Sequence, residues 1–396
     1  MVNQKSYELG SAASVIRALF AYGLEKKKEV GEDNVYDFSI GNPSIPAPKK
    51  VNDTIVKLVN ETDPLKLHGY SMAAGFEDAR QAVAADLQKR FGLDITANDL
   101  FFTCGAAPAL VSVLRALTID PDTNFIVPAP YFPEYKVFAE SGGARLTVLP
   151  ADIPSFQIDL TALEEAVTPH TQGVIINSPN NPSGVVYTKE TIKNIADILQ
   201  KKESEYGHPI YIIADEPYRE LVYDGVQVPF IPHFYKNTIV CYSWSKSLSL
   251  PGERMGYVLV PEQVMEKDRV YAAVAGSARA VGHVCSPSLL QRVITECVAK
   301  KPDLKAYEEN RLLLYDSLTK IGYECAKPDG AFYLFVKAPN GDADAFSEKA
   351  KIEHNLLVVP GAGFGCPSYF RLSYCVANDM IKRSLPAFEK MFAAMA

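Results

Sequence analysis

The residue types around Lys246 could bind a phosphorylated aldehyde. Ser243 and Ser245 come just before this lysine, and Arg254 follows eight residues after it. The apolar run over 238–242 predicts a buried strand, so Lys246 would lie at a strand end beside a ligand rather than in bulk water. A desolvated lysine near another cation has a lowered pKa and can form a Schiff base with a carbonyl, while serine hydroxyls and a guanidinium bind phosphate. The pattern therefore indicates pyridoxal 5′-phosphate (PLP), although a charged surface turn is the alternative.

A carboxylate follows the apolar run over 210–214. Asp215 comes at the end of this run, at the edge where α/β sheets place their ligands. Buried beside a pyridine ring, it would form an ion pair that keeps the ring nitrogen protonated. Tyr218 lies three residues further on and could donate a hydrogen bond to the ring hydroxyl. An aspartate that only caps the turn after a strand is the alternative at this position.

Three further places could contact the same cofactor. Asn181 lies in an Asn-Pro-Ser-Gly loop after the run over 173–177 and can present an amide to the phenolic oxygen. Gly105-Ala106-Ala107 opens a predicted helix, where small residues let backbone N–H groups approach a phosphate. Tyr131 could stack on the ring. Each of these features alone also fits a plain loop or ordinary packing.

The composition is that of a soluble globular protein and argues against several functions. The 396 residues are 47% hydrophobic and 22% charged, with a net charge of −7. This acidic balance argues against nucleic acid or an anionic membrane as a partner. We expect no secretory signal and no membrane span, because residues 1–10 are polar and no apolar run is long enough. The seven cysteines form no C-x-x-C pair and the six histidines show no ligand spacing, so we expect a cytoplasmic protein without a metal site.

Short apolar runs in the middle of the chain predict strands. They are 100–104, 124–128, 145–149, 173–177, 210–214, 238–243 and 255–260. Predicted helices over 107–117, 135–141, 160–167 and 189–206 separate most of them. This alternation indicates an α/β fold with a mainly parallel seven-stranded sheet flanked by helices. Too few residues separate 243 from 255 for a helical crossover, so the last strand should run antiparallel beside 238–243.

The two ends of the chain differ from the middle. A helix is expected over 12–28 and a Pro-rich turn over 41–46. Further helices are expected over 288–299, 304–321, 343–353 and 380–395, with short strands over 323–326, 332–336, 356–359 and 370–374. We expect a large cofactor-binding domain over 46–287 and a smaller α+β domain formed by 1–45 and 288–396.

These motifs, in this order, resemble those of the class I and II aminotransferases of PLP-dependent fold type I, the aspartate aminotransferase superfamily. The resemblance extends from Gly41-Asn42-Pro43 to Phe370-Arg371-Leu372-Ser373. It implies that Lys246 binds the cofactor aldehyde and that Asp215 pairs with the ring nitrogen. It also implies that Tyr218 and Asn181 contact the ring oxygen and that Tyr131 stacks on the ring face. The phosphate would be bound by Ser243, Ser245, Arg254 and the amides of Gly105, Ala106 and Ala107.

The resemblance further implies contacts to the substrate and to a partner subunit. Arg371 would bind the substrate α-carboxylate in a bidentate fork, beside Asn181 and Gly41. Tyr70 would reach the phosphate of the partner subunit in a homodimer with shared active sites. The chain departs from the best-known pattern in two ways: Ala106 and Ala107 lack hydroxyls, and the ring-stacking position holds tyrosine instead of tryptophan. Neither departure undermines cofactor binding.

The substrate side chain is less well defined by the sequence. A second substrate carboxylate needs a second cation. Arg279 is the only arginine within 275–287 and His283 is a weaker candidate, while a structural ion pair explains Arg279 equally well. We expect transamination between an α-amino acid and a 2-oxo acid, with aspartate or glutamate as the candidate substrates. The rivals are β-elimination by a C–S lyase on the same fold and a PLP-binding transcription regulator, for which we expect no spare N-terminal DNA-binding segment.

Overall fold

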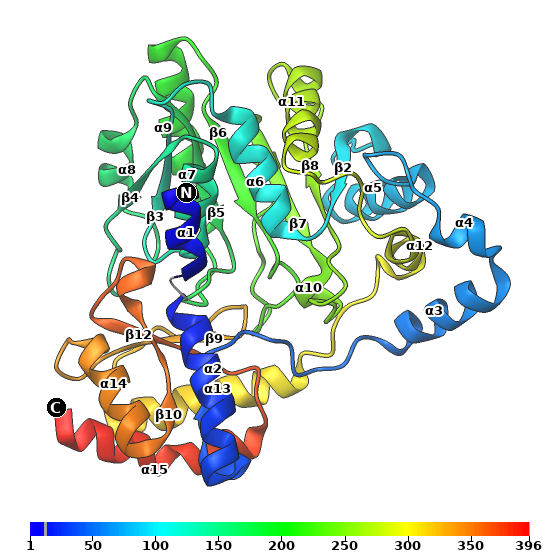
Figure 1. Cartoon of the computed structure of the whole chain (residues 1–396). Helices are drawn as coiled ribbons and strands as arrows, with labels where there is room; N and C mark the ends of the chain where they lie inside the picture. The colour runs from blue at the N-terminus through cyan, green and yellow to red at the C-terminus, as the bar shows by residue number, and fades with distance from the viewer. Residues whose placement is uncertain (12–13, 396) are drawn as a thin grey trace.

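A seven-stranded sheet lies at the centre of the larger part of the molecule (Figure 1). The computed structural model describes residues 1–11 and 14–395. The strands are β2 (Leu100–Thr103), β3 (Asn124–Pro128), β4 (Arg145–Leu149), β5 (Thr171–Asn177), β6 (Tyr211–Asp215), β7 (Thr238–Ser243) and β8 (Gly256–Leu259). Their order across the sheet is β2-β8-β7-β6-β5-β3-β4. All of the strands predicted for the middle of the chain therefore form, and they share one sheet.

One strand of this sheet runs against its neighbours. β8 pairs antiparallel with β7 on one side and with β2 on the other, while the other pairs are parallel. Only the short helix α10 (Trp244–Ser247) and a turn connect β7 to β8, which is too little chain for a crossover. The predicted α/β fold, with a mainly parallel sheet and one antiparallel strand, is confirmed.

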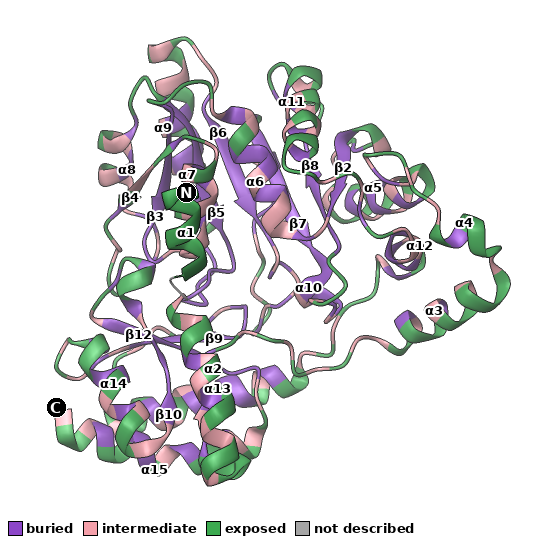
Figure 2. Ribbon diagram, in the orientation of Figure 1, coloured by how far each residue is buried: buried purple, intermediate pink, exposed green. Residues whose placement is uncertain are grey.

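Side chains of the central strands alternate between two apolar cores, one on each face of the sheet. Ile126 belongs to the first core, and its neighbours Phe125 and Val127 belong to the second. Figure 2 shows these central strands buried along their length. The first core includes residues of α3 (Lys49–Glu61), α5 (Glu77–Phe91), α8 (Leu160–Ala166), α9 (Lys189–Tyr206) and α12 (Ser288–Cys297). The second includes residues of α6 (Ala106–Leu117), α7 (Glu134–Ser141) and α11 (Lys267–Ala280).

Residues from both ends of the chain build a second, smaller group of elements. Its strands are β1 (Tyr36–Asp37), β9 (Tyr333–Lys337), β10 (Leu356–Leu357), β11 (Val359–Pro360) and β12 (Tyr369–Ser373), which form the sheets β1-β10 and β11-β12-β9. Its helices are α2 (Val15–Val30), α13 (Lys305–Ile321), α14 (Ala343–His354) and α15 (Asn378–Met395). The remaining helices of the chain are α1 (Gln4–Ser11), α4 (Pro64–His68) and the 3-10 turns Glu32–Asn34, Ala97–Asp99, Ile231–His233 and Gly361–Phe364.

Some expectations for the two ends were wrong. The strand expected over 323–326 does not form, and only an isolated bridge joins Cys325 to Val336, because this segment follows the end of α13 without a continuous ladder partner. Residues 12 and 13 of the helix expected over 12–28 lie outside the described residues, Ser14 is the N-cap of α2, and α2 covers the rest. The short strand β1 was not foreseen, since two residues carry no detectable periodicity.

The proposed domain boundary at residue 287 stays a prediction. The packing of α12 bears on it, because Leu290, Val293 and Ile294 belong to the same apolar core as the large sheet. α12 also packs on α5 and α3. This packing favours a boundary after Cys297.

Candidate active site

A cavity of about 300 Å³ lies at the carboxyl ends of β5, β6 and β7. Parallel strands expose their carboxyl ends at one edge of a sheet, and this is where open α/β sheets bind ligands. The first turn of α6 forms one wall, and residues of β9 and β12 reach the cavity from the smaller group of elements. Most of the candidate site residues line it together: Gly41, Ala106, Ala107, Asn181, Asp215, Tyr218, Ser243, Ser245, Lys246, Arg254 and Arg371.

Lys246 carries a buried amine on the short helix α10. Its Nζ donates a hydrogen bond to the backbone oxygen of Gly41 at 2.7 Å. Burial, with smaller contributions from Arg371 and Arg254, lowers the pKa of Lys246 to about 8. The nitrogen also lies 5.4 Å from the centre of the Phe332 ring. An amine in this state is partly neutral near physiological pH, which a nucleophile or a proton carrier requires.

Asp215 ends β6 as a buried carboxylate with one free oxygen. The Tyr135 hydroxyl donates to Oδ2 at 2.5 Å, and the Asn177 amide donates to the Asp215 backbone oxygen at 3.0 Å. Oδ1 is buried and has no hydrogen-bond partner in the described structure. Burial raises the pKa of Asp215 to about 7. A cationic hydrogen-bond donor at Oδ1 would satisfy this oxygen and stabilise the ionised carboxylate.

Tyr218 is held by a second tyrosine that also lines the cavity. Its hydroxyl lies 2.9 Å from the hydroxyl of Tyr333, and both residues line the cavity. The Gly41 backbone approaches the same place: a Cβ at Gly41 would lie 2.1 Å from the Tyr333 hydroxyl. Glycine is therefore required at residue 41, where the chain passes between Tyr333 and Lys246.

Arg254 meets the first turn of α6. Gly105, the N-cap of this helix, has φ +98°, and a Cβ there would lie 2.8 Å from the Arg254 guanidinium. The guanidinium also donates to the backbone oxygen of Pro251 at 3.0 Å. A helix N-terminus with open N–H groups, a guanidinium and the hydroxyl residues Ser243 and Ser245 form one wall of the cavity. This combination suits a phosphate.

Arg371 is a buried cation without a carboxylate partner. It donates to the Asn181 side chain at 3.0 Å and to the Ser39 backbone oxygen at 2.6 Å, and no acidic side chain in the described residues forms an ion pair with it. Its Nε has no hydrogen-bond partner. Burial lowers the pKa of Arg371, and its guanidinium lies 4.7 Å from the centre of the Tyr333 ring. A carboxylate entering the cavity would compensate this desolvated charge.

Several candidate residues do not line the cavity of their own chain. Tyr70, in the loop after α4, is 89% exposed, and Arg279 is exposed in the last turn of α11. His283 is half-buried, with Nε2 3.2 Å from the Phe102 backbone oxygen, and burial lowers its pKa. Tyr131 is half-buried against Gly365, and its neighbour Phe132 lines the cavity in its place.

Sequence reasoning missed other residues of the site. Tyr135, Asn177 and Tyr333 were not selected, although each touches a residue that was. The spacing of Phe132 and Tyr135 places both on one turn near Asp215. That spacing was the only sequence signal for Tyr135 as a site residue. Ile16 of α2 also lines the cavity, and nothing in the N-terminal sequence indicates this. The described residues contain no group of three or more histidine, cysteine or acidic side chains able to bind a metal, and none of their helices has the length and apolarity to cross a membrane.

Comparison with known proteins agrees with this geometry. The family model described as aminotransferase class I and II matches residues 33–388. The crystal structure of an aminotransferase from Eubacterium rectale is 58% identical, with a TM-score of 0.98, over 100% of this chain and 99% of that one. An aspartate aminotransferase from Geobacillus stearothermophilus is 29% identical over 94% of this chain and 95% of its own. An aromatic-amino-acid aminotransferase from Thermococcus litoralis is 28% identical over 96% of this chain and 95% of its own. The chain therefore belongs to the class I and II aminotransferase family and is an aminotransferase.

Proposed function

We propose that this aminotransferase uses PLP to exchange the amino group of an α-amino acid with that of a 2-oxo acid. One observation carries the proposal: a buried amine of lowered pKa, Lys246, shares a cavity with the buried and unpaired cation Arg371. The amine suits chemistry at the aldehyde carbonyl of a cofactor, and the guanidinium suits the carboxylate of a substrate. Transamination of an α-amino acid needs both groups.

The residues of the cavity fit PLP. The free Oδ1 of Asp215 suits a protonated ring nitrogen, because it is a buried acceptor without a donor. Tyr218 and Asn181 can donate to the ring oxygen. The phosphate fits the wall formed by Arg254, the first turn of α6 and the hydroxyl residues Ser243 and Ser245. Phe132 replaces Tyr131 as the aromatic residue proposed to stack on the ring.

The side chains divide the chemistry between them. When bound, PLP supplies a carbonyl that condenses with amines and a ring that withdraws electrons from the substrate α-carbon. The neutral amine of Lys246 would hold the cofactor, and, once the substrate has freed it, Nζ would accept the substrate α-proton and return it. Asp215 keeps a proton on the ring nitrogen, and Arg371 orients the substrate through its α-carboxylate.

We propose aspartate or glutamate as the amino donor. Relatives named as aspartate aminotransferases support this choice, although others carry different substrate names. The cations that line the cavity are Lys246, Arg254 and Arg371. In the proposal they already bind the cofactor aldehyde, the phosphate and the substrate α-carboxylate. Arg279 can therefore bind a second carboxylate only in a site shared between subunits.

A substrate panel tests the proposed function. Cofactor-loaded enzyme mixed with single amino acids should lose the visible absorption of the aldehyde cofactor and release a 2-oxo acid, and a second 2-oxo acid should restore the absorption. The variant Arg279→Ala should lower kcat/KM for aspartate by a factor equivalent to about 2–5 kcal/mol, because the charged contact that Arg279 would make in a shared site is lost. The loss for alanine should be much smaller.

Two outcomes of this panel would count against the proposal. Pyruvate with ammonia or thiol, formed from a cysteine conjugate without any 2-oxo acid acceptor, would identify a C–S lyase instead. The dicarboxylate assignment alone would fall if Arg279→Ala lowered kcat/KM equally for aspartate and alanine. It would also fall if the wild type did not react with aspartate or glutamate. Neither result would contradict transamination.

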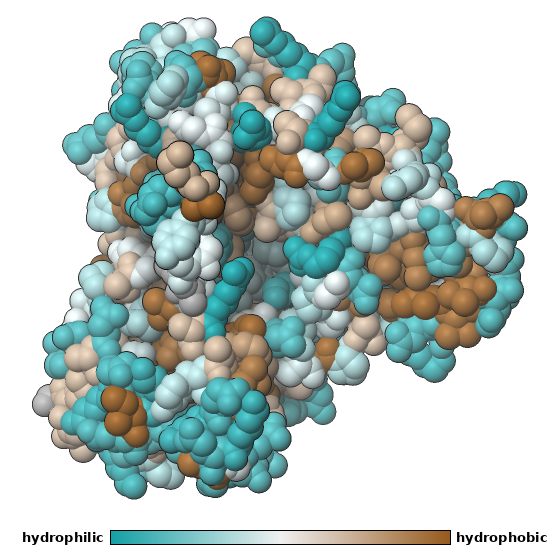
Figure 3. All heavy atoms as spheres, in the orientation of Figure 1, coloured by the Kyte–Doolittle hydropathy of each residue, from teal (hydrophilic) through white to brown (hydrophobic). Residues whose placement is uncertain are grey.

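We also propose a homodimer with shared active sites. Exposed apolar side chains gather on α3, α4 and the loop that follows, among them Val56, Val59, Leu65 and Met72, with Tyr70 between them. Figure 3 shows apolar surface over α3 and α4. A contiguous apolar patch of this kind marks an interaction surface. Contact of this surface with a second copy would bring Tyr70 toward the partner subunit's phosphate wall.

Mixing two inactive variants tests the shared site. Tyr70→Ala and Lys246→Ala should each be inactive alone, but subunit exchange between them should restore part of the activity, since one site of each mixed dimer then has both groups. Activity is followed in mixtures after exchange is verified by mass spectrometry. The absence of rescue in a verified mixed dimer would contradict the shared site.

We propose a cytoplasmic location for the enzyme. All seven cysteines are free thiols, and several of them are buried. Structural disulfides are rare in reducing compartments, so a protein with this many unpaired thiols suits one.

A further inference from the structure

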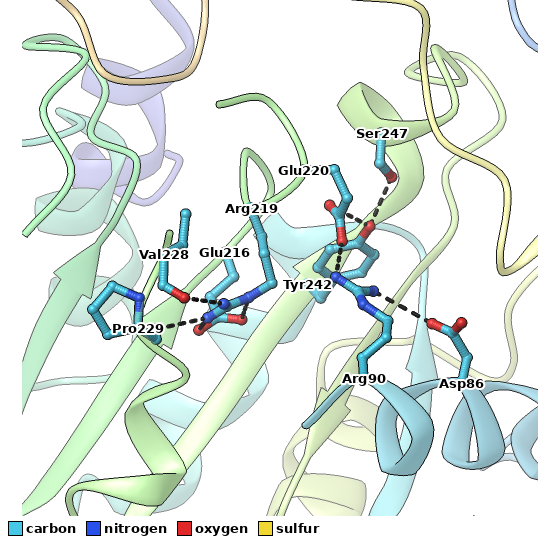
Figure 4. A network of polar contacts seen from close by, with 9 residues as sticks. All are labelled: Asp86, Arg90, Glu216, Arg219, Glu220, Val228, Pro229, Tyr242 and Ser247. Atoms are coloured by element: carbon cyan, nitrogen blue, oxygen red, sulfur yellow. Dashed lines mark hydrogen bonds and ion pairs between the residues drawn. The ribbon is translucent and has the colours of Figure 1, made fainter. Parts of the chain in front are cut away.

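The segment that follows β6 has two sides. Asp215 and Tyr218 line the cavity, whereas Glu216, Arg219 and Glu220 do not and lie against the large sheet (Figure 4). Arg219 forms a buried ion pair with Glu216 and donates to the backbone oxygens of Val228 and Pro229, each at 3.2 Å. The same short segment therefore carries cavity residues and their attachment to the protein core.

A chain of polar contacts joins this segment to the lysine helix (Figure 4). The Tyr242 hydroxyl lies 2.9 Å from Glu220 Oε2 and 2.7 Å from Ser247 Oγ. Ser247 is the residue directly after Lys246. At the other end, Arg90 of α5 donates to Glu220 Oε1 at 2.7 Å and to Asp86 at 3.3 Å.

The direction of these hydrogen bonds follows from their chemistry. A carboxylate only accepts, so the single Tyr242 proton goes to Glu220 and the Ser247 hydroxyl donates to the tyrosine oxygen. Burial raises the pKa of Tyr242, which keeps its hydroxyl protonated. Arg90 compensates the Glu220 charge, and the Tyr257 ring stacks on Tyr242 with centroids 5.0 Å apart. Each side chain in this series of contacts thus has a hydrogen-bond or ion-pair partner.

We propose that Tyr242, held by Glu220, is a positioning residue that fixes helix α10 and thereby sets Lys246 opposite Asp215 and Tyr218. A helix as short as α10 is not stable by itself and needs tertiary contacts to keep its place. The Tyr242–Ser247 contact supplies one on the residue next to Lys246. Glu220 belongs to the same segment as Asp215 and Tyr218. The polar contacts through Tyr242 therefore link that segment to the helix of Lys246. The inference rests on the proposed role of Lys246.

The variant Tyr242→Phe tests this proposal in the cofactor-loaded enzyme. It keeps the ring and its stacking but removes the hydroxyl that joins Glu220 to Ser247. We expect kcat to fall roughly 10- to 100-fold through misplacement of the reacting amine, with KM little changed. The pH profile of kcat should move to higher pH, because water reaching the freed amine of Lys246 during turnover raises its pKa toward the ordinary value. Amide hydrogen exchange over 244–248 should be faster.

Tyr235→Phe is the matched control. Tyr235 is a buried tyrosine of the same large-sheet core whose hydroxyl donates to the Ile210 backbone oxygen at 2.6 Å, outside the cavity lining. It should lower stability without changing the pH profile of kcat or the exchange over 244–248. Ser247→Ala removes only the last contact and should give a smaller change in the same direction, which keeps the test open if Tyr242→Phe does not fold.

Two results would overturn the proposal. One is that Tyr242→Phe matches the wild type both in exchange over 244–248 and in the pH profile of kcat. If Tyr242→Phe is unfolded, the same match in Ser247→Ala has the same meaning. The other is an equal change in Tyr235→Phe, which would indicate a general loss of stability. The exchange measurement does not depend on what Lys246 binds, so it can fail separately from the proposed function.

Discussion

Lys246→Ala should abolish turnover and leave a folded protein. Loss of the group that moves the substrate proton lowers kcat by roughly 10²–10⁴-fold by itself, and loss of the covalent attachment of the cofactor adds to this. The fold should survive, because the amine is desolvated in the wild type and its removal relieves a buried charge. Steady-state kinetics measure the first effect and thermal unfolding the second.

Lys202→Ala is the control for this experiment. Its side chain is also largely shielded, but it pairs with Glu205 on the surface of α9, away from the cavity. Kinetics of this variant should match the wild type. Substantial transamination by Lys246→Ala would show that another group carries the proton, and the assignment of the cofactor lysine would fall with it.

The large sheet was predictable because its central strands are buried on both faces. β3, β6, β7 and the second half of β5 contain short apolar runs that end in small or polar residues, and such runs need no alternation to be recognised. The antiparallel β8 followed from the short connection after β7. The strand expected over 323–326 failed for the opposite reason: it has apolar residues, but pairing depends on a partner that local sequence does not specify.

The cavity was predictable where residues follow strand ends. Asp215 ends β6, while Asn181 and Lys246 follow β5 and β7, and a parallel sheet must bring those ends together. The choice of Tyr131 over Phe132 needed the side-chain directions of a turn, which residue types do not reveal. Tyr135 contacts Asp215 across the sheet edge, from a helix far away in the chain.

The residues proposed to act across a subunit interface were the least predictable. Tyr70 and Arg279 are exposed in one chain, so their proposed roles depend on a second copy. A single sequence contains no direct signal of how two copies meet, and the exposed apolar side chains of α3 and α4 form one surface only in the folded chain (Figure 3). The network of Arg90, Glu220 and Tyr242 likewise joins segments that are distant in sequence.

Arg371→Ala should lower kcat/KM for the amino acid substrate by about 2–5 kcal/mol, or roughly 30- to 4000-fold, because one partner of a buried charged contact is lost. Arg371→Lys keeps the charge but loses the planar fork, so its loss should be smaller. Kinetics with the amino acid and with the corresponding amine that lacks the carboxylate measure the effect. The amine should react equally slowly with wild type and variant.

The comparison with the amine separates binding of the carboxylate from a structural role. Arg371 also donates to Asn181 and to the Ser39 backbone oxygen, so its removal could loosen the cavity wall without any carboxylate being involved. Loosening would slow the amine and the amino acid alike, whereas loss of a carboxylate contact slows only the amino acid. Arg383→Ala, which removes an exposed pair with Asp33, should leave both reactions unchanged. If Arg371→Ala slows both substrates to the same extent, the unpaired guanidinium supports the cavity wall instead, and the substrate carboxylate must bind elsewhere.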